Sequence, residues 1–310
     1  MLEPTVHVLL ATYQGEAFLK QQLDSLTGQS YTNWHLHISD DASTDSALQI
    51  IAEFIKGTSQ VVTVYDGPCK GVTYNFFHLI NTVASHPADL YAFCDQDDVW
   101  LPDKLRDAVA HFQNQTLATN QLYLYCTRTN IVDSQLGYLG LSAVPRKRLG
   151  FGNALVQNIA SGNTMVFNNS LLETLRLVDL QYSVLHDWTA YQVVTGCGGV
   201  IHFSDKPSLL YRQHSQNLVG SNNSIRARFK RFRFLLQGGY RRWSLQTICA
   251  MHKLRPVLAP ENAQLLHLFE SVHQKADVTQ RLLLSKNMLL WRQTRFGQAS
   301  LLFALIFNLL

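Results

Sequence analysis

The amino-acid sequence predicts an α/β fold, with a mostly parallel sheet flanked by helices and a helical, basic C-terminal region. In the first half of the chain, short apolar strand patterns alternate with amphipathic helix patterns, which is typical of the crossovers that build parallel sheets. The second observation is charge: residues 206–260 hold eleven Lys and Arg and no acidic residue, whereas the rest of the chain holds 15 basic and 22 acidic residues. We therefore expect two domains, at residues 1–220 and 221–310.

Four strand patterns and four helix patterns alternate in the first 112 residues. Val6–Thr12 is a short apolar run, and Trp34–Ser39 alternates apolar and polar residues as a strand does. Apolar residues recur at helical spacing in 16–26, and Ser43 is placed to cap the following helix. In order, the predicted elements are strand 6–12, helix 16–26, strand 34–39, helix 43–54, strand 61–65, helix 75–83, strand 90–94, helix 103–112, and strands 122–127 and 129–132.

Composition excludes several classes of protein. With 46% hydrophobic residues the chain can build a core, which excludes intrinsic disorder. The five cysteines are widely spaced and form no C-x-x-C pair, so they indicate buried residues in a reducing compartment and not a disulfide framework or a zinc site. No signal-peptide pattern opens the sequence, and the apolar tail 299–310 is shorter than the ~20 residues that span a bilayer. We expect a protein on the cytosolic side of the membrane.

Polar clusters follow three of the predicted strands. Thr12 and Tyr13 follow the first, Asp40 and Asp41 the second, and the sequence D-Q-D-D at 95–98 the fourth. In open α/β sheets ligands bind beyond the carboxyl ends of the strands, so we expect a site where these clusters converge. No G-x-G-x-x-G and no P-loop motif is present, which excludes the usual dinucleotide and P-loop phosphate cradles.

The acidic cluster predicts a metal site. Asp95, Asp97 and Asp98 repel one another unless a cation or hydrogen-bond donors neutralise them. Carboxylate oxygens suit Mg²⁺ or Mn²⁺, and Mg²⁺ is commonly held by one or two carboxylates together with substrate phosphates. The alternative is a solvated acidic turn ahead of the next helix.

The remaining candidates each have a plainer alternative. Asp40 and Asp41 fit either a turn or contacts to a nucleoside. Asp187, in H-D-W at 186–188, is either a general base or the start of a helix. In Y-R-Q-H at 211–214, Arg212 fits a phosphate contact and His214 fits a metal ligand. The alternative for both is a structural role. Residues 161–164 (S-G-N-T) form a small polar turn that contacts the donor sugar or acceptor, or is an ordinary loop.

Together these motifs resemble a known family. A-T-Y at 11–13, S-D-D-A-S-T-D at 39–45, D-Q-D-D-V-W at 95–100, H-D-W and Y-R-Q-H occur in the order and spacing of family 2 nucleotide-sugar glycosyltransferases, which have a GT-A fold. The D-Q-D-D-V-W and Y-R-Q-H forms resemble the bacterial rhamnosyltransferases that build cell-wall, capsule or O-antigen polysaccharides. The resemblance covers about residues 5–220.

The resemblance implies roles for the nucleotide site. Thr12, Tyr13 and Asp41 hold the base, and Asp40 supports their loop. Arg212, expected from its own chemistry to contact a phosphate, is assigned to the same nucleotide-sugar site. Many members carry Asn after the Tyr, where this chain has Gln14.

The resemblance also implies the metal ligands and the base. Asp98 is the main ligand of a Mn²⁺ or Mg²⁺ ion, with Asp95 in the same cluster, and His214 completes the metal shell. Asp97 contacts the ribose or the metal. Asp187 is the base that activates the acceptor hydroxyl, while the metal stabilises the charge on the departing nucleoside diphosphate.

The basic segment Ile225–Trp243 interleaves seven Lys and Arg with five aromatic residues. Such a stretch suits an amphipathic helix on an anionic membrane surface, with nucleic-acid binding or a solvated helix face as alternatives. No nucleic-acid motif accompanies it, so we expect no nucleic-acid partner. The expected membrane-surface residues are Arg226, Arg228, Lys230, Arg231 and Arg233.

These expectations combine into one function. The chain is expected to be an inverting, metal-dependent glycosyltransferase that moves L-rhamnose from dTDP-L-rhamnose to a lipid-linked glycan, peripherally on the inner face of the cell membrane. The alternatives are another donor such as UDP-glucose or UDP-galactose, and an inactive scaffold subunit, against which the intact Asp98 and Asp187 argue. A homo-oligomer is also compatible with the sequence.

Overall fold

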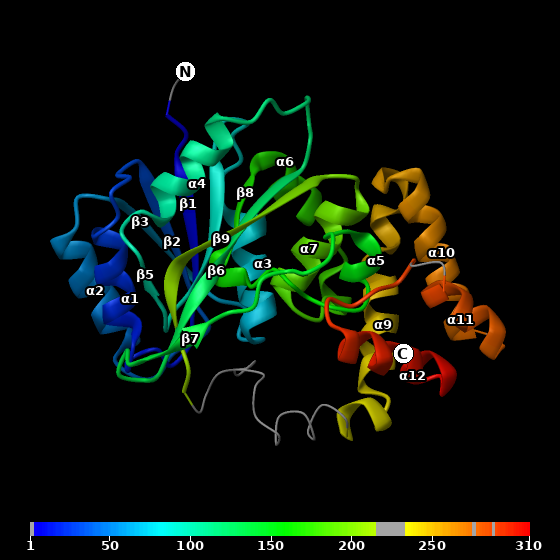
Figure 1. Ribbon diagram of the computed structural model, residues 1–310. Coiled ribbons are helices and arrows are strands. Elements are labelled where there is room, and N and C mark those ends of the chain that lie inside the picture. Colours follow the sequence, from blue (N-terminus) through cyan, green and yellow to red (C-terminus); the bar gives the residue numbers. More distant parts are fainter. Residues whose placement is uncertain (1–2, 215–232, 275–276, 287–288) are drawn as a thin grey trace. The chain divides into compact units, whose positions relative to one another are not determined.

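The computed structural model describes residues 3–214, 233–274, 277–286 and 289–310 (Figure 1). The chain forms two compact units, which we describe separately. Unit 1 comprises residues 1–144, 160–176 and 200–215, and unit 2 comprises residues 145–159, 177–199 and 216–310. The chain therefore passes between the units several times, and the single boundary at residue 220 stays a prediction.

Unit 1 is built on one nine-stranded sheet with the order β3-β2-β1-β4-β8-β6-β9-β5, and β7 pairs with β6. The first four strands are mutually parallel, as the alternation of strands and helices predicts, and β6 is parallel to β9. β8 runs antiparallel to β4 and β6, and β5 runs antiparallel to β9. The strands are β1 (Val6–Thr12), β2 (Trp34–Asp40), β3 (Val61–Asp66), β4 (Leu90–Asp95), β5 (Val99–Trp100), β6 (Tyr123–Val132), β7 (Tyr138–Leu141), β8 (Val166–Asn168) and β9 (Val200–Arg212).

Helices cover both faces of this sheet (Figure 1). The apolar sides of α1 (Leu19–Thr27), α2 (Ala47–Gly57) and α4 (Lys104–Gln113) share a buried cluster with alternate side chains of β1, β2 and β4. α3 (Val72–Thr82) packs on the opposite face, where the rings of Phe76 and Phe93 lie 5.2 Å apart. Side chains point alternately to the two faces of a strand, so β1 serves both layers.

The predicted strands 6–12, 34–39, 61–65 and 90–94 and their helices are confirmed, with shifts at the ends. Two local predictions are wrong. Ser43 does not cap a helix at 43, because α2 begins at Ala47 and the Ser43 hydroxyl donates to Asp40. Residues 122–127 and 129–132 are not two strands but one, β6.

The sheet register brings the predicted polar clusters to one edge. Thr12 is the register partner of Asp40, and Ala11 is the partner of Asp95. Three parallel strands therefore end side by side, and their following loops meet at the carboxyl edge of the sheet.

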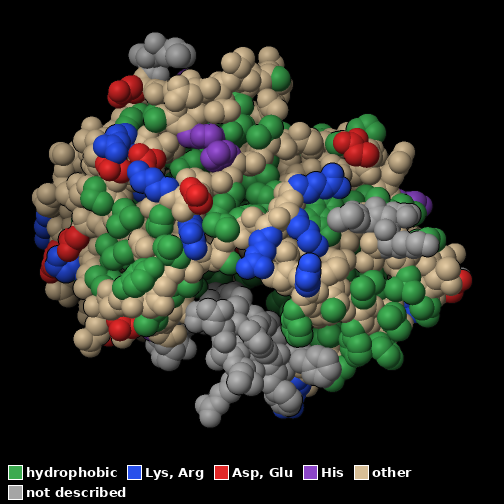
Figure 2. Space-filling model, in the orientation of Figure 1, with side chains coloured by type: hydrophobic (Ala, Val, Ile, Leu, Met, Phe, Trp, Pro, Cys, Tyr) green, Lys and Arg blue, Asp and Glu red, His purple; other side chains and the backbone are tan. Residues whose placement is uncertain are grey.

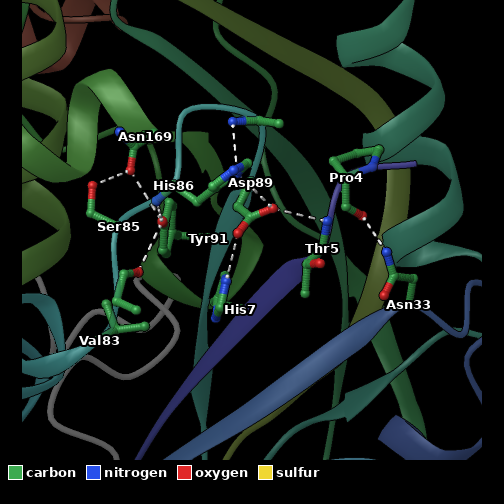
Figure 3. Close-up of polar contacts among 12 residues, drawn as sticks. Pro4, Thr5, His7, Asn33, Val83, Ser85, His86, Asp89, Tyr91 and Asn169 are labelled. Atoms are coloured by element: carbon green, nitrogen blue, oxygen red, sulfur yellow. Dashed lines mark hydrogen bonds and ion pairs between the residues drawn. The ribbon is translucent and has the colours of Figure 1, made fainter. Parts of the chain in front are cut away.

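A chain of histidines runs across β1 and β2 to Tyr65 on β3. Nδ1 of His7 lies 2.9 Å from Nε2 of His37, whose Nδ1 lies 3.1 Å from the Tyr65 hydroxyl. Nε2 of His7 lies 3.1 Å from Asp89, which Figure 3 shows between His7 and the backbone of Thr5. Burial lowers the pKa of His7 and lowers that of His37 to about 4, so both rings are neutral at pH 7.

Unit 2 is helical in its described part. Its helices are α5 (Phe151–Ala154), α7 (His186–Gly196), α9 (Gly239–Ala250), α10 (Pro260–Gln274), α11 (Val278–Lys286) and α12 (Arg295–Ile306). Figure 2 shows hydrophobic side chains gathered on the surface of the last two helices, at the lower right of the view. None of the helices in the described ranges combines the length and apolar character needed to cross a bilayer.

Candidate active site

Gln96 joins the first and fourth strand ends in unit 1. Its Oε1 accepts hydrogen bonds from the Thr12 hydroxyl at 2.7 Å and from the Tyr13 amide at 2.9 Å, and its Nε2 donates to the Tyr13 carbonyl at 3.0 Å. The Tyr13 ring is 55% exposed above this joint. Thr12 and Tyr13 therefore lie where the sequence places them, beside the acidic loop, and the exposed ring offers a face for stacking a base.

The two aspartates after β2 are buried and organise loops. The Asp40 carboxylate accepts from the Ser43 amide at 2.8 Å and the Ser43 hydroxyl at 2.6 Å. Asp41 accepts from the amides of Cys69 and Gly71, at 2.6 and 2.7 Å. These contacts suit the supporting role predicted for Asp40. They also tie Asp41 to the loop before α3, a structural contact of the kind that the turn alternative for this pair allows.

Gln14 occupies the position after Tyr13, where many members of the family that the motifs resemble carry Asn. Its φ of 49° lies in the left-handed region, which Asn adopts more easily than most residues. Its side chain donates to the Thr44 hydroxyl at 2.9 Å and accepts from the amides of Thr44 and Asp45 at 3.2 and 3.1 Å. Gln14 thus holds the loops after β1 and β2 together.

Asp97 and His214 form the pair at the centre of the site. Nε2 of His214 lies 2.7 Å from Oδ2 of Asp97, and the His214 ring packs 4.8 Å from the ring of Phe18. Both side chains are largely but not fully buried. The two atoms contact each other directly, and a carboxylate oxygen and an imidazole nitrogen are both atom types that bind metal ions.

Asp98 lies behind this pair and is fully buried. Its Oδ1 accepts from the Arg212 amide at 3.2 Å, and its Oδ2 accepts from Nδ2 of Asn163 at 2.5 Å. Burial, followed by the charges of Asp97 and Asp95, raises its pKa well above the ordinary value. The S-G-N-T turn therefore supports the acidic loop through Asn163, which is buried and not exposed to a sugar.

A buried lysine stabilises the same region. Nζ of Lys104 donates to the Asn163 carbonyl at 2.6 Å and lies 4.4 Å from the ring of Trp100. Burial lowers the Lys104 pKa to about 8, and the neighbouring Cys94, Asp98 and Asp95 act in the opposite direction. The Lys104 cation therefore interacts favourably with the Asp98 and Asp95 carboxylates of the acidic loop.

Arg212 is buried, and its guanidinium contacts acceptors within the protein. Its guanidinium is 1% exposed, lies 4.5 Å above the Phe18 ring, and donates to the carbonyls of Asp97 and Ser134 at 2.8 and 2.7 Å and to Oε1 of Gln21 at 2.5 Å. These contacts clamp the acidic loop from beneath. They do not support the predicted contact with the nucleotide sugar.

The described residues contain no ready-made cluster of three or more His, Cys, Asp or Glu side chains for a metal. A pair such as Asp97 and His214 nevertheless fits a cation that arrives with a substrate diphosphate, because Mg²⁺ is commonly held by few protein ligands plus phosphate and water. The chemistry of the donor set thus suits Mn²⁺ or Mg²⁺.

Asp187 belongs to unit 2, in the first turn of α7. Its Oδ1 accepts from the Trp188 amide at 2.6 Å, and the Trp188 indole donates to the Ala154 carbonyl at 2.6 Å. Burial lowers the pKa of the preceding His186 to about 3, so that ring is neutral. The positive end of the helix dipole favours the carboxylate form of Asp187, which is the form that accepts a proton.

Of the five predicted membrane-surface residues, only Arg233 lies in the described part of the chain, and it is exposed. Arg226, Arg228, Lys230 and Arg231 lie outside the described residues.

Several residues of the site were missed by sequence analysis. They are Gln96, Lys104 and Gln21, together with Asn75, which donates to the carbonyls of Thr12 and Ser39 at 3.3 and 2.8 Å. Gln96 lies inside the acidic motif, and this position was the one available signal; the others follow no pattern.

Several known proteins are similar to this chain in sequence, and solved structures are similar to it in fold. The family model "Glycosyl transferase family 2" matches residues 7–176. The dTDP-rhamnosyl transferase RfbG of Shigella flexneri is 31% identical over 244 residues, which cover 75% of this chain and 81% of RfbG. The Escherichia coli enzyme WfgD, named a UDP-Glc:alpha-D-GlcNAc-diphosphoundecaprenol beta-1,3-glucosyltransferase, is 25% identical over 54% of this chain and 61% of its own length.

A solved structure shows the same architecture. The mannosyltransferase PcManGT from Pyrobaculum calidifontis, in complex with GDP-Man and Mn²⁺, superposes with a TM-score of 0.53 at 14% identity, covering 100% of this chain and 86% of PcManGT. The sheet order, the loops converging at its carboxyl edge and the family match lead to one conclusion. This chain belongs to glycosyl transferase family 2 and has the GT-A fold.

Proposed function

We propose that this glycosyltransferase moves L-rhamnose from dTDP-L-rhamnose to a lipid-linked glycan, with inversion at the anomeric carbon. The observation that carries the proposal is the convergence of Tyr13, Gln96 and the Asp97–His214 pair at one sheet edge. The name of RfbG, similar over three quarters of the chain, supports rhamnose as the sugar. The name of WfgD, which includes a diphosphoundecaprenol acceptor, supports the lipid-linked glycan.

We assign the metal to Asp97 and His214, with Asp95 beside them and Asp98 behind them. Both oxygens of Asp98 already accept hydrogen bonds from the protein, and its side chain is fully buried, so the geometry favours Asp97 over Asp98 as the direct ligand. Mn²⁺ or Mg²⁺, when bound, supplies a Lewis acid for the departing diphosphate. Tyr13 stacks the base, and Thr12 and Gln96 hold Tyr13 in place.

Asp187 is the proposed catalytic base. An acceptor hydroxyl is a poor nucleophile, so it needs a carboxylate that removes its proton as the new glycosidic bond forms. One base on the acceptor and one stabilised leaving group suffice for a single displacement, which inverts the anomeric centre. The first turn of α7 favours ionised Asp187, and Trp188 packs the base of that turn into the protein.

We also propose that unit 2 docks on the anionic inner face of the cell membrane. Within unit 2, residues 216–260 contain no Asp or Glu and nine Lys and Arg. On α12, Phe296 is 78% exposed, and Phe307 just after it is 59% exposed. Basic residues and exposed aromatic side chains in the same unit match the chemistry of an interfacial anchor.

A donor panel tests the function. Purified protein is incubated with dTDP-L-rhamnose, UDP-glucose and UDP-galactose, each with Mn²⁺ or with EDTA, and release of the nucleoside diphosphate is measured. We expect release from dTDP-L-rhamnose in the presence of Mn²⁺ and no release with EDTA. Preferential release from a UDP-sugar shows that the donor is that sugar nucleotide and not dTDP-L-rhamnose. Release from none of the donors under either condition favours an inactive scaffold.

A further inference from the structure

An aromatic cluster in unit 2 packs against the helix that carries Asp187. The ring of Trp243, on α9, lies 5.6 Å from that of Trp188, the residue after Asp187. It lies 4.8 Å from the ring of Phe234 and 5.6 Å from that of Tyr240. The start of α7 and the aromatic side chains of α9 are therefore one packed group.

A glycine turn shapes this cluster. Gly238 has a φ of 69°, a backbone conformation that L side chains rarely adopt. A Cβ placed on Gly239 would meet ring atoms of Phe234 at 2.3–2.4 Å. The turn thus lets Phe234 fold back over the first turn of α9 and contact Trp243.

A hollow lies beside the cluster. Its volume is about 360 Å³, and it is lined by Phe234, Arg242, Trp243, Leu245 and Gln246. This volume falls in the range of small-molecule sites, which combine apolar and aromatic walls with a few polar groups. The Arg242 guanidinium offers donors only, whereas the Gln246 amide offers both donors and an acceptor.

We propose that this hollow binds the terminal sugar of the acceptor glycan. A sugar ring has apolar C–H faces and a rim of hydroxyl groups, so it matches an aromatic wall flanked by a guanidinium and an amide. One residue of the wall, Trp243, contacts Trp188, the residue after the proposed base, and this contact links the hollow to the start of α7. The inference rests on the proposed function for its role in catalysis, but sugar binding itself does not.

Binding is tested without a donor. Saturation-transfer NMR is recorded on the full chain with methyl α-L-rhamnopyranoside, methyl N-acetyl-β-D-glucosaminide and, separately, dihexanoyl phosphatidylglycerol. We expect saturation of the ring protons of at least one glycoside, lost in Trp243→Ala and retained in Phe296→Ala, which removes an exposed ring outside the hollow. Equal glycoside signals in wild type and Trp243→Ala, no glycoside signal in wild type, or signals from lipid acyl protons alone each overturn the proposal.

A second variant covers the case in which Trp243→Ala fails to fold. Arg242 is exposed, so Arg242→Gln leaves the core unchanged. With the glycoside that binds as acceptor, we expect its KM to rise about tenfold, the equivalent of about 1.4 kcal/mol, with the donor KM and acceptor-independent donor hydrolysis unchanged. An unchanged acceptor KM contradicts the hollow as acceptor site. Sugar binding without any transfer from the donor panel contradicts the proposed function instead.

Discussion

Nε2 of His214 lies 2.7 Å from Oδ2 of Asp97, although 117 positions separate the two residues in the chain. β9 ends at Arg212, next to the loop that follows β4, and Arg212 itself ties the two segments together through the Asp97 carbonyl. The pair is therefore a product of the sheet topology. It brings together, at the carboxyl edge, the two atoms that we propose as metal ligands; a diphosphate would supply the remaining ones.

Two aspartate variants distinguish the proposed direct metal ligand, Asp97, from the buried Asp98, which holds the acidic loop in place. In Asp97→Asn we expect the Mn²⁺ concentration for half-maximal activity to rise at least about tenfold with an unchanged melting temperature, because one charged ligand is lost. In Asp98→Asn we expect a loss of roughly 1–3 kcal/mol in the free energy of unfolding, because the amide presents a donor to Asn163 or to the Arg212 amide. Activity titrations with Mn²⁺ and thermal unfolding measure both. The opposite pattern identifies Asp98 as the ligand.

Arg212→Lys tests the clamp beneath the acidic loop. Lysine keeps the charge but cannot reach all three acceptors of the guanidinium, so we expect the free energy of unfolding to fall by roughly 1–3 kcal/mol and kcat to fall. Calorimetric titration with dTDP should give an unchanged Kd. Arg128→Lys, which removes a guanidinium contact to the Ser142 carbonyl just after β7, is the control and should keep kcat. If the dTDP affinity of Arg212→Lys is at least tenfold weaker, Arg212 contacts the nucleotide-sugar donor, as the sequence predicts.

Asp187→Asn tests the base. We expect kcat to fall by roughly 10²–10⁴-fold, the usual contribution of a positioned general base, with the dTDP affinity unchanged. Asp179→Asn, in the same unit and paired with Lys253, is the matched control and should stay close to wild type. A variant of Asp187 that keeps its kcat leaves the proposed mechanism without a proton acceptor.

Sequence periodicity predicts the elements that follow a regular apolar pattern. The strands β1 to β4 are short apolar or alternating runs, and the structure confirms them. β9 escaped prediction because Asp205, Lys206 and Pro207 interrupt its middle, where the register to β6 also shifts. β8 is only three residues long.

The residues of the candidate site likewise fall into those that the sequence indicates and those that it does not. The charged residues of the acidic loop were visible because their types and spacing indicate chemistry. Gln96 and Asn163 lie inside motifs that the sequence marks, but the roles of their neutral amides were not predictable, since they depend on which polar groups the fold brings within reach. The burial of Arg212 and Lys104 was equally invisible, because charged side chains are normally found on the surface.

The membrane proposal is tested by neutralising the basic segment. Replacing Arg226, Arg228, Lys230, Arg231 and Arg233 by Gln should abolish co-sedimentation with phosphatidylglycerol vesicles, because each charge contributes about 1 kcal/mol near an anionic surface. The control neutralises five exposed basic residues of unit 1 and should still sediment: Lys20, Lys56, Lys70, Arg106 and Lys206. Equal sedimentation of both variants at low salt assigns the basic segment to an ordinary solvated surface.

The histidine chain of unit 1 predicts a loss of stability in acid. The contacts in Figure 3 and the pair formed by His7 and His37 fit one set of neutral tautomers, in which Tyr65 donates to His37, His37 to His7, and His7 to Asp89. A proton added to His37 removes the acceptor that Tyr65 uses.

The sign of the effect follows from the lowered pKa values. Between pH 6.5, where an unfolded histidine titrates, and about pH 4, where folded His37 does, the unfolded chain binds more protons than the folded one. The free energy of unfolding therefore falls as the pH falls through this window, by about 3 kcal/mol from His37 alone. His37→Gln keeps a donor for His7 but does not titrate, so urea unfolding at pH 7.5 and pH 4.5 should show a smaller acid loss in this variant than in wild type. His267→Gln, an exposed histidine on α10, should match wild type. An acid loss in His37→Gln as large as that of the wild type assigns the effect to the other histidines whose pKa is lowered, namely His7, His111, His186, His202 and His273.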